Sequence, residues 1–564
     1  MDSKRNGATE RFLAQLMTGR FRWDLLVPFP EQSPADREIG DTVVRDMEDF
    51  VSCHVDAVAA DETRRLPQRF YDALRASDFL ALQVDRTDGG LGLSDFNTFR
   101  VLSAAAAGSG AAGFCIGTHN GIGLPALLPA LPPGPMRDLV LRRIRDRVIS
   151  GWADTEPIGA GNDLPSAIAT PVDGAYLISG DKVFISNGAV ADELIVSAAT
   201  PGDEAACLFI VDTRTPGFRV SSVQDVIGFN GLPLAAIHFD RVRVPAERVL
   251  SSPTDNWRMA PLFEPTSARG RLYLVSGAAV AIANTCLDFQ RDFARRRVVN
   301  GQPLVSYQAI QDLHAASVAD VFAMDTTIRW CLLGADSDLM VRNLERRAAK
   351  NATTLTCWRV VDRTMSLLAA EGAETAASKA RRGAPALPME RLFRDARILR
   401  ITGGVDFAVD IWAAEAMFAR SYYPAADPEP SVLPDSVALS ARNRDHLGAT
   451  AREVYEVGRA CRRLAREHPD QASLLADQRT LRAVGRLVGE LFTMAVVLAR
   501  VATQADDLYH QHVADVYCTH TRRRIAALRP ILDTPDDTPH RQVADRWLAP
   551  EEVTAGIPQP QRVG

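Results

Sequence analysis

The hydrophobic period of this chain changes twice, and these changes limit the folds open to it more than any other feature. From about residue 38 to residue 147, apolar residues recur at three- and four-residue steps, which predicts amphipathic helices; examples are Ile39, Val43, Met47 and Phe50. After residue 148 come short β-rich runs, including AYLISGDKVFI and AIHFDRVRVP, separated by Gly, Asp and Pro. Helical spacing returns from about residue 257 to residue 420. The pattern predicts a mainly α protein with a small central β-domain.

A chain of 564 residues is too long for one compact core, so we expect several domains. The Pro-rich stretch YYPAADPEPSVLP cannot continue a helix and is expected to be a linker, after which helical spacing resumes. In the β-domain, SGD between two apolar runs is a hairpin candidate because Gly180 can adopt a positive φ. The predicted domains are N-terminal helical (1–149), middle β (150–255), second helical (256–424), and linker with C-terminal helical extension (425–564).

Charge and cysteine content exclude several classes of protein. A formal charge of -6 gives no basic surplus of the kind that nucleic-acid binders show. The eight cysteines form no C-x-x-C pair, so neither a metal site nor a disulfide framework is expected. No window approaches the roughly 20 apolar residues that span a bilayer, and the N-terminus lacks an apolar signal core. We therefore expect a cytoplasmic protein with no membrane span and no nucleic-acid partner.

The β-domain contains a turn suited to holding an anionic or polar ligand. WADTEPIGAGND, residues 152–163, offers a Thr hydroxyl, turn glycines and exposed backbone N–H groups. Together with KVFISNG, FDRVRVPAERVL, DGGLGLS, GQPLVSYQAIQ and RDARILRI, it resembles the signature phrases of the acyl-CoA dehydrogenase family, in the family's order over roughly residues 25–420. The resemblance implies an N-terminal helical bundle, a β-barrel-like domain, a C-terminal helical bundle and an FAD cofactor.

The resemblance also assigns cofactor contacts. Thr155 is expected to bond the pyrimidine edge of the flavin, and Ser186 the flavin nitrogen that accepts hydride. Phe184 would stack near the ring, although an inward-facing strand residue is the plainer interpretation. The remaining members of the implied set are Trp152, Gly161, Asn162 near the pyrophosphate, Arg297 reaching the FAD of a neighbouring subunit, and Gln308. A run of arginines at a helix end is also compatible with a simple solvated surface.

One departure affects the adenosine half of FAD. The family's Gln-x-x-Gly-Gly-x-Gly appears here as SLLAAEG, residues 366–372, with alanine in place of two glycines. A methyl group at these positions keeps the backbone from approaching a ligand as closely.

The catalytic carboxylate of the family is missing. Its α-proton acceptor, the Glu of IYEGT or IFEGT, aligns with Gly403, and the alternative address before Arg271 is Gly270. Glycine has no side chain to accept a proton. The candidates are Asp406, Glu264, His119 and Asp154, although Asp406 also suits a helix N-cap and a lone His is more often structural.

The implied activity is α,β-desaturation of an acyl thioester, bound to coenzyme A or a carrier protein, with an unconventional or displaced base. Arg271 and His119 are expected to contact the substrate, and an electron-transfer flavoprotein or oxygen to accept the electrons. The alternatives are a flavin-dependent monooxygenase or oxidase, which needs no such base, and a non-catalytic FAD- or acyl-binding relative. The extension resembles that of very-long-chain members, which implies a homodimer.

Overall fold

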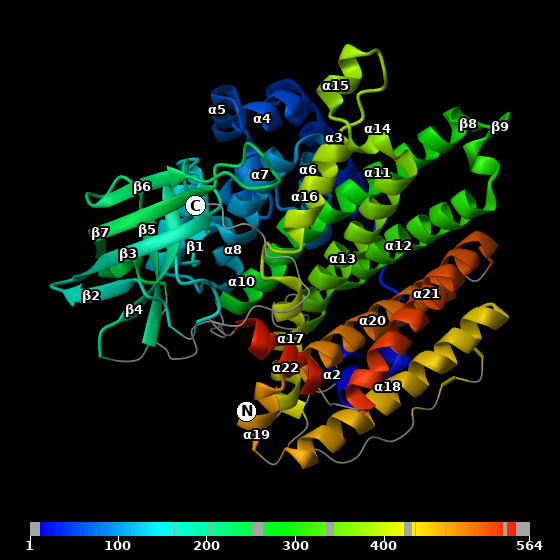
Figure 1. Ribbon diagram of the computed structural model, residues 1–564. Helices are drawn as coiled ribbons and strands as arrows, with labels where there is room; N and C mark the ends of the chain where they lie inside the picture. Colours follow the sequence, from blue (N-terminus) through cyan, green and yellow to red (C-terminus); the bar gives the residue numbers. More distant parts are fainter. Residues whose placement is uncertain are drawn as a thin grey trace.

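The computed structural model describes residues 12–548, except 163, 203–204, 251–262, 334–342, 422–430, 432, 435, 469, 505 and 534–537. A first helical block, a seven-stranded sheet and a second helical block follow one another along the chain (Figure 1). Further helices form a C-terminal extension. The predicted linker lies mostly outside the described residues.

The N-terminal helices begin at side-chain caps that the sequence supplies. Ser33, Ser94 and Ser109 each accept a bond from a backbone N–H of the following turn. The helices are α2 (Phe12–Met17), α3 (Pro34–His54), α4 (Ala57–Thr63), α5 (Gln68–Ala76), α6 (Asp95–Gly108), α7 (Gly110–Ile122), α8 (Leu124–Leu127) and α9 (Pro135–Arg145). Short 3₁₀ turns join these and later elements: η1 (Trp23–Leu25), η2 (Asp78–Leu80), η3 (Arg86–Asp88), η4 (Leu128–Ala130), η5 (Ala246–Arg248) and η8 (Leu304–Ser306).

The middle of the chain forms a seven-stranded sheet with order β1-β4-β2-β3-β7-β6, and β5 pairs with β4. Its strands are β1 (Ser150–Ala153), β2 (Ile168–Val172), β3 (Ala175–Ile185), β4 (Glu193–Thr200), β5 (Ala205–Asp212), β6 (Phe218–Val223) and β7 (Ala235–Pro245). The sheet has its own apolar core, which includes Ile178, Phe209 and Phe239. The predicted β-domain is thus present, with mixed strand directions.

The hairpin predicted at SGD is wrong. Gly180 lies inside β3, at a register shift between β3 and β7, and its φ of +138° belongs to a β-bulge. The chain reverses earlier, between β2 and β3, at Asp173 and Gly174, whose φ is +62°. Both glycines permit a positive φ, so residue type alone did not distinguish a bulge from a turn.

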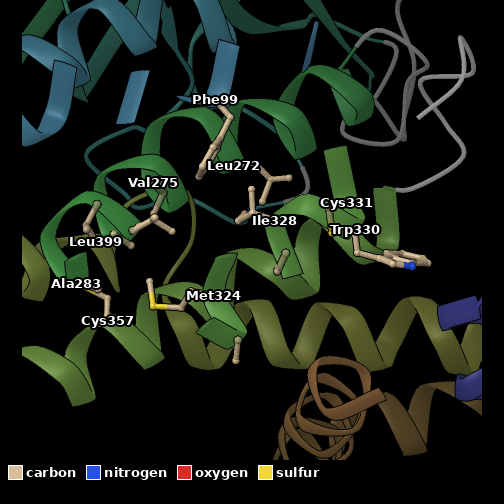
Figure 2. Close-up of a cluster of buried hydrophobic side chains, with 14 of the residues drawn as sticks. Phe99, Leu272, Val275, Ala283, Met324, Ile328, Trp330, Cys331, Cys357 and Leu399 are labelled. Atoms are coloured by element: carbon tan, nitrogen blue, oxygen red, sulfur yellow. The ribbon is translucent and has the colours of Figure 1, made fainter. Parts of the chain in front are cut away.

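The second helical block is built around long buried helices. It contains α10 (Phe263–Gly270), the π-helix η7 (Arg271–Ser276), α11 (Gly277–Arg296), α12 (Gln308–Leu332), α13 (Asn343–Leu368), α14 (Ala370–Ala373), α15 (Ala376–Arg381), α16 (Met389–Leu399) and α17 (Asp406–Ser421). A small hairpin, β8 (Val298–Val299) and β9 (Gln302–Pro303), joins α11 to α12. Figure 2 shows how α6, η7 and α11–α13 share one core, with Phe99, Leu272, Met324 and Cys357 among its side chains.

The C-terminal extension packs directly on this block. It consists of α18 (Ala441–Glu467), α19 (Gln471–Ala476), α20 (Gln478–Ala502), α21 (Leu508–Asp533) and α22 (Thr538–Leu548). The short N-terminal helix α2 lies among the extension helices, far from α3 in Figure 1. The ring of Phe12 lies 6.4 Å from Phe492 of α20 and 6.3 Å from Trp330 of α12.

Within the described residues, one helical stretch, 266–296, is long and apolar enough by composition to cross a membrane, contrary to the sequence expectation. Its most apolar window is 72% buried inside the protein, as in a core helix. Figure 1 places this stretch, α10 to α11, between the other helices of the second block.

Candidate active site

Two hydroxyl side chains in loops that follow strands of the sheet have no hydrogen-bond partner among the described residues. Thr155 follows β1, Ser186 follows β3, and both are half-buried. The two loops are tied together because the N–H of Val183 donates to the carbonyl of Thr155 at 2.8 Å. Across the described part of the chain, neither hydroxyl has a hydrogen-bond partner. Both are therefore available to a ligand at this edge of the sheet.

A buried ion pair holds the loop that carries Thr155. The Nζ of Lys182, which is fully buried, donates to Glu156 Oε1 at 2.8 Å and to the carbonyl of Asp154 at 3.2 Å. Burial opposes ionisation of Glu156, but the bonds from Lys182 and two backbone N–H groups outweigh it and lower the pKa of that carboxyl. Ser197 Oγ donates to Asp154 Oδ1 at 2.8 Å, so Asp154 serves the loop rather than standing free as a base.

An exposed aromatic ring and an open glycine turn lie beside these hydroxyls in the sequence. Phe184 is 56% exposed and has a φ of +58°, an uncommon conformation for a bulky residue. Its N–H donates to Gln224 Oε1 at 2.6 Å. In the turn, Gly159 and Gly161 have φ values of +98° and +100°. These features fit one face and one polar edge of a flat ring system such as a flavin.

The other predicted members of this set lie in the same turn or just before it. Trp152 is half-buried in β1, and Asn162 is exposed, with its Nδ2 3.4 Å from the carbonyl of Gly159. Trp412 of α17 lies against the turn, since a Cβ on Gly161 would be 3.9 Å from its ring. The same ring would lie 3.1 Å from a Cβ on Gly404. Trp412 therefore joins the turn of the sheet to the loop that precedes α17.

Arg297 and Gln308 are not brought to this place within one chain. Both are exposed, at the end of α11 and the start of α12. Figure 1 shows the β8–β9 hairpin between them at the opposite end of the molecule from the seven-stranded sheet. This separation is what a contact to a second subunit requires, and it leaves their role a prediction.

The alanine that replaces the first glycine of the adenosine segment keeps a glycine-like backbone. Ala369 has a φ of +50° and a ψ of -133°. This combination is costly for a residue with a Cβ, by about 1–3 kcal/mol. The backbone path of this segment therefore suits glycine, although the residue has changed.

The loop in place of the family's catalytic Glu is fixed by two cations. Arg271, the first residue of η7, donates its Nε to the carbonyl of Gly403 at 2.7 Å. Lys350 of α13 donates its Nζ to the carbonyl of Gly404 at 2.6 Å. Gly403 and Gly404 have φ values of +71° and +107°. A π-helix is a frequent device at functional sites because it redirects one side chain.

Neither of the two glycines at the usual base positions could accept a longer side chain freely. A Cβ on Gly270 would lie 2.3 Å from Ile122 Cγ2 and 2.8 Å from the carbonyl oxygen of Gly121. At Gly403 a Cβ would lie 3.3 Å from Arg271 Cγ, on a left-handed backbone. A glutamate is therefore disfavoured at position 270 by the packing around it, and at position 403 by the left-handed backbone.

Lys350 is a residue that sequence reasoning missed. Burial lowers the pKa of its ammonium to about 7, with Arg271 acting in the same direction and Asp406 and Asp410 opposing it. The sequence does carry a signal for a buried lysine. Lys350 is the one charged residue in the run AAKNATT, where its neighbours are small or uncharged.

His119 has both ring nitrogens bonded inside the protein, contrary to the prediction that it contacts the substrate. Its side chain is fully buried, its Nε2 bonds the carbonyl of Leu80 at 2.8 Å, and its Nδ1 accepts from the N–H of Ser150 at 3.0 Å. Burial lowers its pKa to about 4. Both ring nitrogens are engaged in joining α7 to neighbouring segments, so His119 is structural.

Asp406 is held as a helix-start residue. Its Oδ2 accepts from Arg400 Nε at 2.8 Å, and its Oδ1 accepts from the N–H of Phe407 at 2.8 Å. Burial opposes ionisation, but the bond from Arg400, its positive charge and the N–H of Phe407 together outweigh it and lower the pKa of Asp406, which makes it a weak proton acceptor. The side chain of Glu264 lies outside the described residues, although its backbone belongs to α10.

Comparison with known proteins gives a consistent result. Family models match in order: "Acyl-CoA dehydrogenase, N-terminal domain" at 33–130, "middle domain" at 152–242 and "C-terminal domain" at 266–408, together more than half of the chain. A "probable acyl-CoA dehydrogenase FadE10" of Mycobacterium tuberculosis is 27% identical over 560 residues, which cover 92% of this chain and 85% of that protein. The bovine mitochondrial very long-chain specific acyl-CoA dehydrogenase is 22% identical, covering 73% of this chain and 63% of that protein.

A solved structure shares the fold over nearly the whole length. It is an acyl-CoA dehydrogenase complexed with FAD from Bacillus anthracis, with a TM-score of 0.75, 17% identity and 94% of both chains covered. Butyryl-CoA dehydrogenase from Megasphaera elsdenii matches 69% of this chain and 99% of its own, with a TM-score of 0.59 and 20% identity. Because it covers 94% of this chain, the first likeness includes most of the C-terminal helices.

Proposed function

Since this chain belongs to the acyl-CoA dehydrogenase family of FAD-dependent oxidoreductases, we propose that it desaturates an acyl thioester between the α and β carbons. The observation that carries this proposal is the pair of half-buried hydroxyls, Thr155 and Ser186, which have no partner within the described residues. They stand beside the exposed ring of Phe184, on a sheet whose turn meets α17 through Trp412.

In this proposal the side chains of the sheet orient the cofactor. Bound FAD supplies the acceptor for the hydride that leaves the β-carbon. Thr155 holds the pyrimidine edge of the ring, Ser186 bonds the ring nitrogen at the reacting side, and Phe184 covers one face. Arg271 keeps the Gly403 carbonyl in place beside the thioester arm. The buried pair of Lys182 and Glu156 keeps the Thr155 loop in this position.

The α-proton acceptor has to come from outside positions 270 and 403. Asp406 is tied to Arg400, so Glu264, seven residues before Arg271 on the helix that runs into η7, is the first candidate to test. If Glu264 is the base, Glu264→Gln reduces the rate of flavin reduction by two or more orders of magnitude, the usual contribution of a general base. Asp406→Asn is the matched control and leaves that rate within a few fold.

The direct test is anaerobic addition of acyl-CoA thioesters of several chain lengths to the FAD-loaded enzyme. We expect the yellow flavin colour to bleach with a productive thioester. A thioester with two methyl groups on the α-carbon offers no proton there and should leave the colour unchanged. If no thioester, whether on coenzyme A or on a carrier protein, bleaches the flavin, the desaturation proposal fails.

A second candidate is an oxygen-using monooxygenase or oxidase on the same scaffold. The closed position at Gly270 and the fixed loop at Gly403 favour it, because such an enzyme needs no base at the α-carbon. Chemically reduced enzyme mixed with oxygen and candidate substrates should then yield an oxygenated product or hydrogen peroxide. Slow reoxidation that yields neither argues against this candidate.

The finer assignments are proposals of the same kind. We propose a cytoplasmic homodimer that passes electrons to an electron-transfer flavoprotein when it acts as a dehydrogenase. Light scattering of the purified FAD-bound protein gives the subunit number. Loss of FAD binding in Arg297→Gln, at unchanged thermal stability of the cofactor-free protein, is expected if Arg297 reaches the cofactor of the partner subunit.

A further inference from the structure

A polar hollow lies where the C-terminal extension meets the catalytic helices. Its volume is about 410 Å³, within the range of small-molecule sites. The loop before α3, the helices α3, α6 and α12, and the C-terminal end of α20 all line it. This position is separate from the sheet that carries Thr155.

Four arginines from four helices line the hollow: Arg37, Arg100, Arg329 and Arg500. Three of these side chains are partly buried, with exposed fractions of 25% for Arg100, 31% for Arg329 and 15% for Arg500. Partly desolvated guanidinium groups attract anions more strongly than fully solvated ones, because less water screens the interaction.

Protein acceptors use only part of this donor capacity. Arg329 donates its Nε to Asp325 at 2.8 Å, and within the described residues its two terminal nitrogens have no hydrogen-bond acceptor. Arg500 Nη1 donates to Asp325 and Thr326 at 2.7 and 2.8 Å, which leaves its Nε and Nη2 unused in the described part of the chain. The guanidinium of Arg37 has no acceptor among those residues either. Arg100 is more fully occupied, by Asp41 and Asn97.

The charge balance also favours an anion. Glu31 is the one acidic side chain among the residues that line the hollow. Three further carboxylates lie next to lining residues and are already bonded: Asp325 and Asp41 pair with arginines, and Asp36 accepts from Gln32 and Asn97. Among the lining side chains themselves, four guanidinium groups and one carboxylate leave a net positive charge. A buried oxygen of Gln504, which has no partner within the described residues, offers an acceptor for a ligand hydroxyl at the same rim.

We propose that this hollow binds a small polyanion with two adjacent phosphate groups, such as pyrophosphate or a nucleoside diphosphate. Planar guanidinium forks from different helices suit the several oxygens of such a group. Because Arg329 belongs to α12 and Arg500 to α20, the bound anion would join the extension to the catalytic helices and stabilise their packing.

The test uses the FAD-saturated protein, so that the cofactor occupies its own phosphate site. Titration calorimetry with inorganic pyrophosphate and with ADP should show saturable binding, together with a rise in melting temperature. Tighter binding of ADP indicates a nucleotide source, and equal binding indicates that the diphosphate alone is recognised. Arg329→Gln should weaken binding about tenfold, as expected for the loss of a charged donor pair.

Two further variants separate loss of the anion site from loss of stability and from a general change of charge. Arg37→Gln removes a guanidinium that holds no protein partner in the described chain, so it should weaken binding without loss of melting temperature in the absence of anion. Arg219→Gln makes the same charge change on the exposed strand β6 and should bind as the unaltered protein does. The proposal is overturned if neither anion binds, or if Arg37→Gln and Arg329→Gln bind as tightly as Arg219→Gln.

Discussion

Lys350 ties the glycine loop before α17 to the interior of the helical block, and its ionisation is coupled to folding. Burial lowers the pKa of the folded-state ammonium from 10.5 to about 7. Between these two values the unfolded chain binds one proton more than the folded chain. The free energy of unfolding should therefore rise with pH across this window, by up to about 1.4 kcal/mol per pH unit. Below pH 7 the contribution of Lys350 should not change with pH.

Denaturant unfolding of the unaltered protein and of Lys350→Met at pH 7, 8 and 9 measures this coupling. The difference in free energy of unfolding between the two should grow in favour of the unaltered protein as pH rises. A difference that is constant over this range would falsify the assignment of a neutral buried lysine.

Gly403 stands where most members of the family have the catalytic Glu, so Gly403→Glu tests whether the carboxylate can be restored. Gly403→Glu should lower the free energy of unfolding by about 1–2 kcal/mol, since a side chain is unfavourable at a φ of +71°. It should not speed flavin bleaching, because the new carboxylate would pair with Arg271, whose Cγ would lie 3.3 Å from the added Cβ. Gly403→Ala isolates the backbone cost, and faster bleaching in the Glu variant alone would place the missing base at 403.

The residues of the candidate site show what sequence can and cannot supply. The resemblance of the phrases around Thr155 and Ser186 to the family predicts a cofactor edge, and the structure shows two hydroxyls there that have no hydrogen-bond partner among the described residues, so their role stays a prediction. The partners of Asp406 are local, and its position at a helix start was among the interpretations that the sequence offered. The partners of His119, Leu80 and Ser150, lie 39 and 31 residues away, and no local pattern reveals them. Lys350 escaped notice for the same reason, since its acceptor, the Gly404 carbonyl, is 54 residues away.

At the scale of elements, the adenosine segment between α13 and α14 keeps its backbone path despite a changed residue. Ala369→Gly should raise the free energy of unfolding by about 1 kcal/mol, because glycine adopts a φ of +50° and a ψ of -133° without a Cβ conflict. FAD should bind at least as tightly. Ala370→Gly, at the first position of the short helix α14, is the matched control and should be neutral or destabilising. An Ala369→Gly variant less stable than the parent contradicts this account.

Helices and strands were predicted well where one period persists over many residues, as in α3 and α20. The β2–β3 reversal was misplaced because the turn and the bulge both use glycine, and only the pairing of β3 with β7 decides between them. The hydrophobic pattern does not predict the π-helix η7, because the apolar spacing of LYLVS suits an α-helix equally well.

At the scale of the whole molecule, the extension approaches the catalytic block most closely at a backbone contact between α20 and α17. A Cβ on Gly485 of α20 would lie 2.0 Å from the carbonyl oxygen of Asp410 in α17. Gly485→Ala should therefore lower the free energy of unfolding by about 1–3 kcal/mol through overpacking. Gly489→Ala, one turn further along the same helix, meets nothing within 4 Å and should be neutral or stabilising by up to about 1 kcal/mol.

Thermal unfolding of both variants, with and without FAD, is the measurement. Equal effects of the two substitutions would mean that α20 does not rest on α17 as described. If Gly485→Ala alone also weakens FAD binding, the extension supports the loop that holds Gly403.

The lodging of α2 among the extension helices couples segments that are far apart in the chain. Phe12 has ring partners on α12 and α20, so α2 loses part of its packing whenever either helix unfolds. Contacts between such distant segments form only after a long loop has closed. Docking of α2 is therefore expected to be a late step in folding, and α2 and the extension should be protected from hydrogen exchange together.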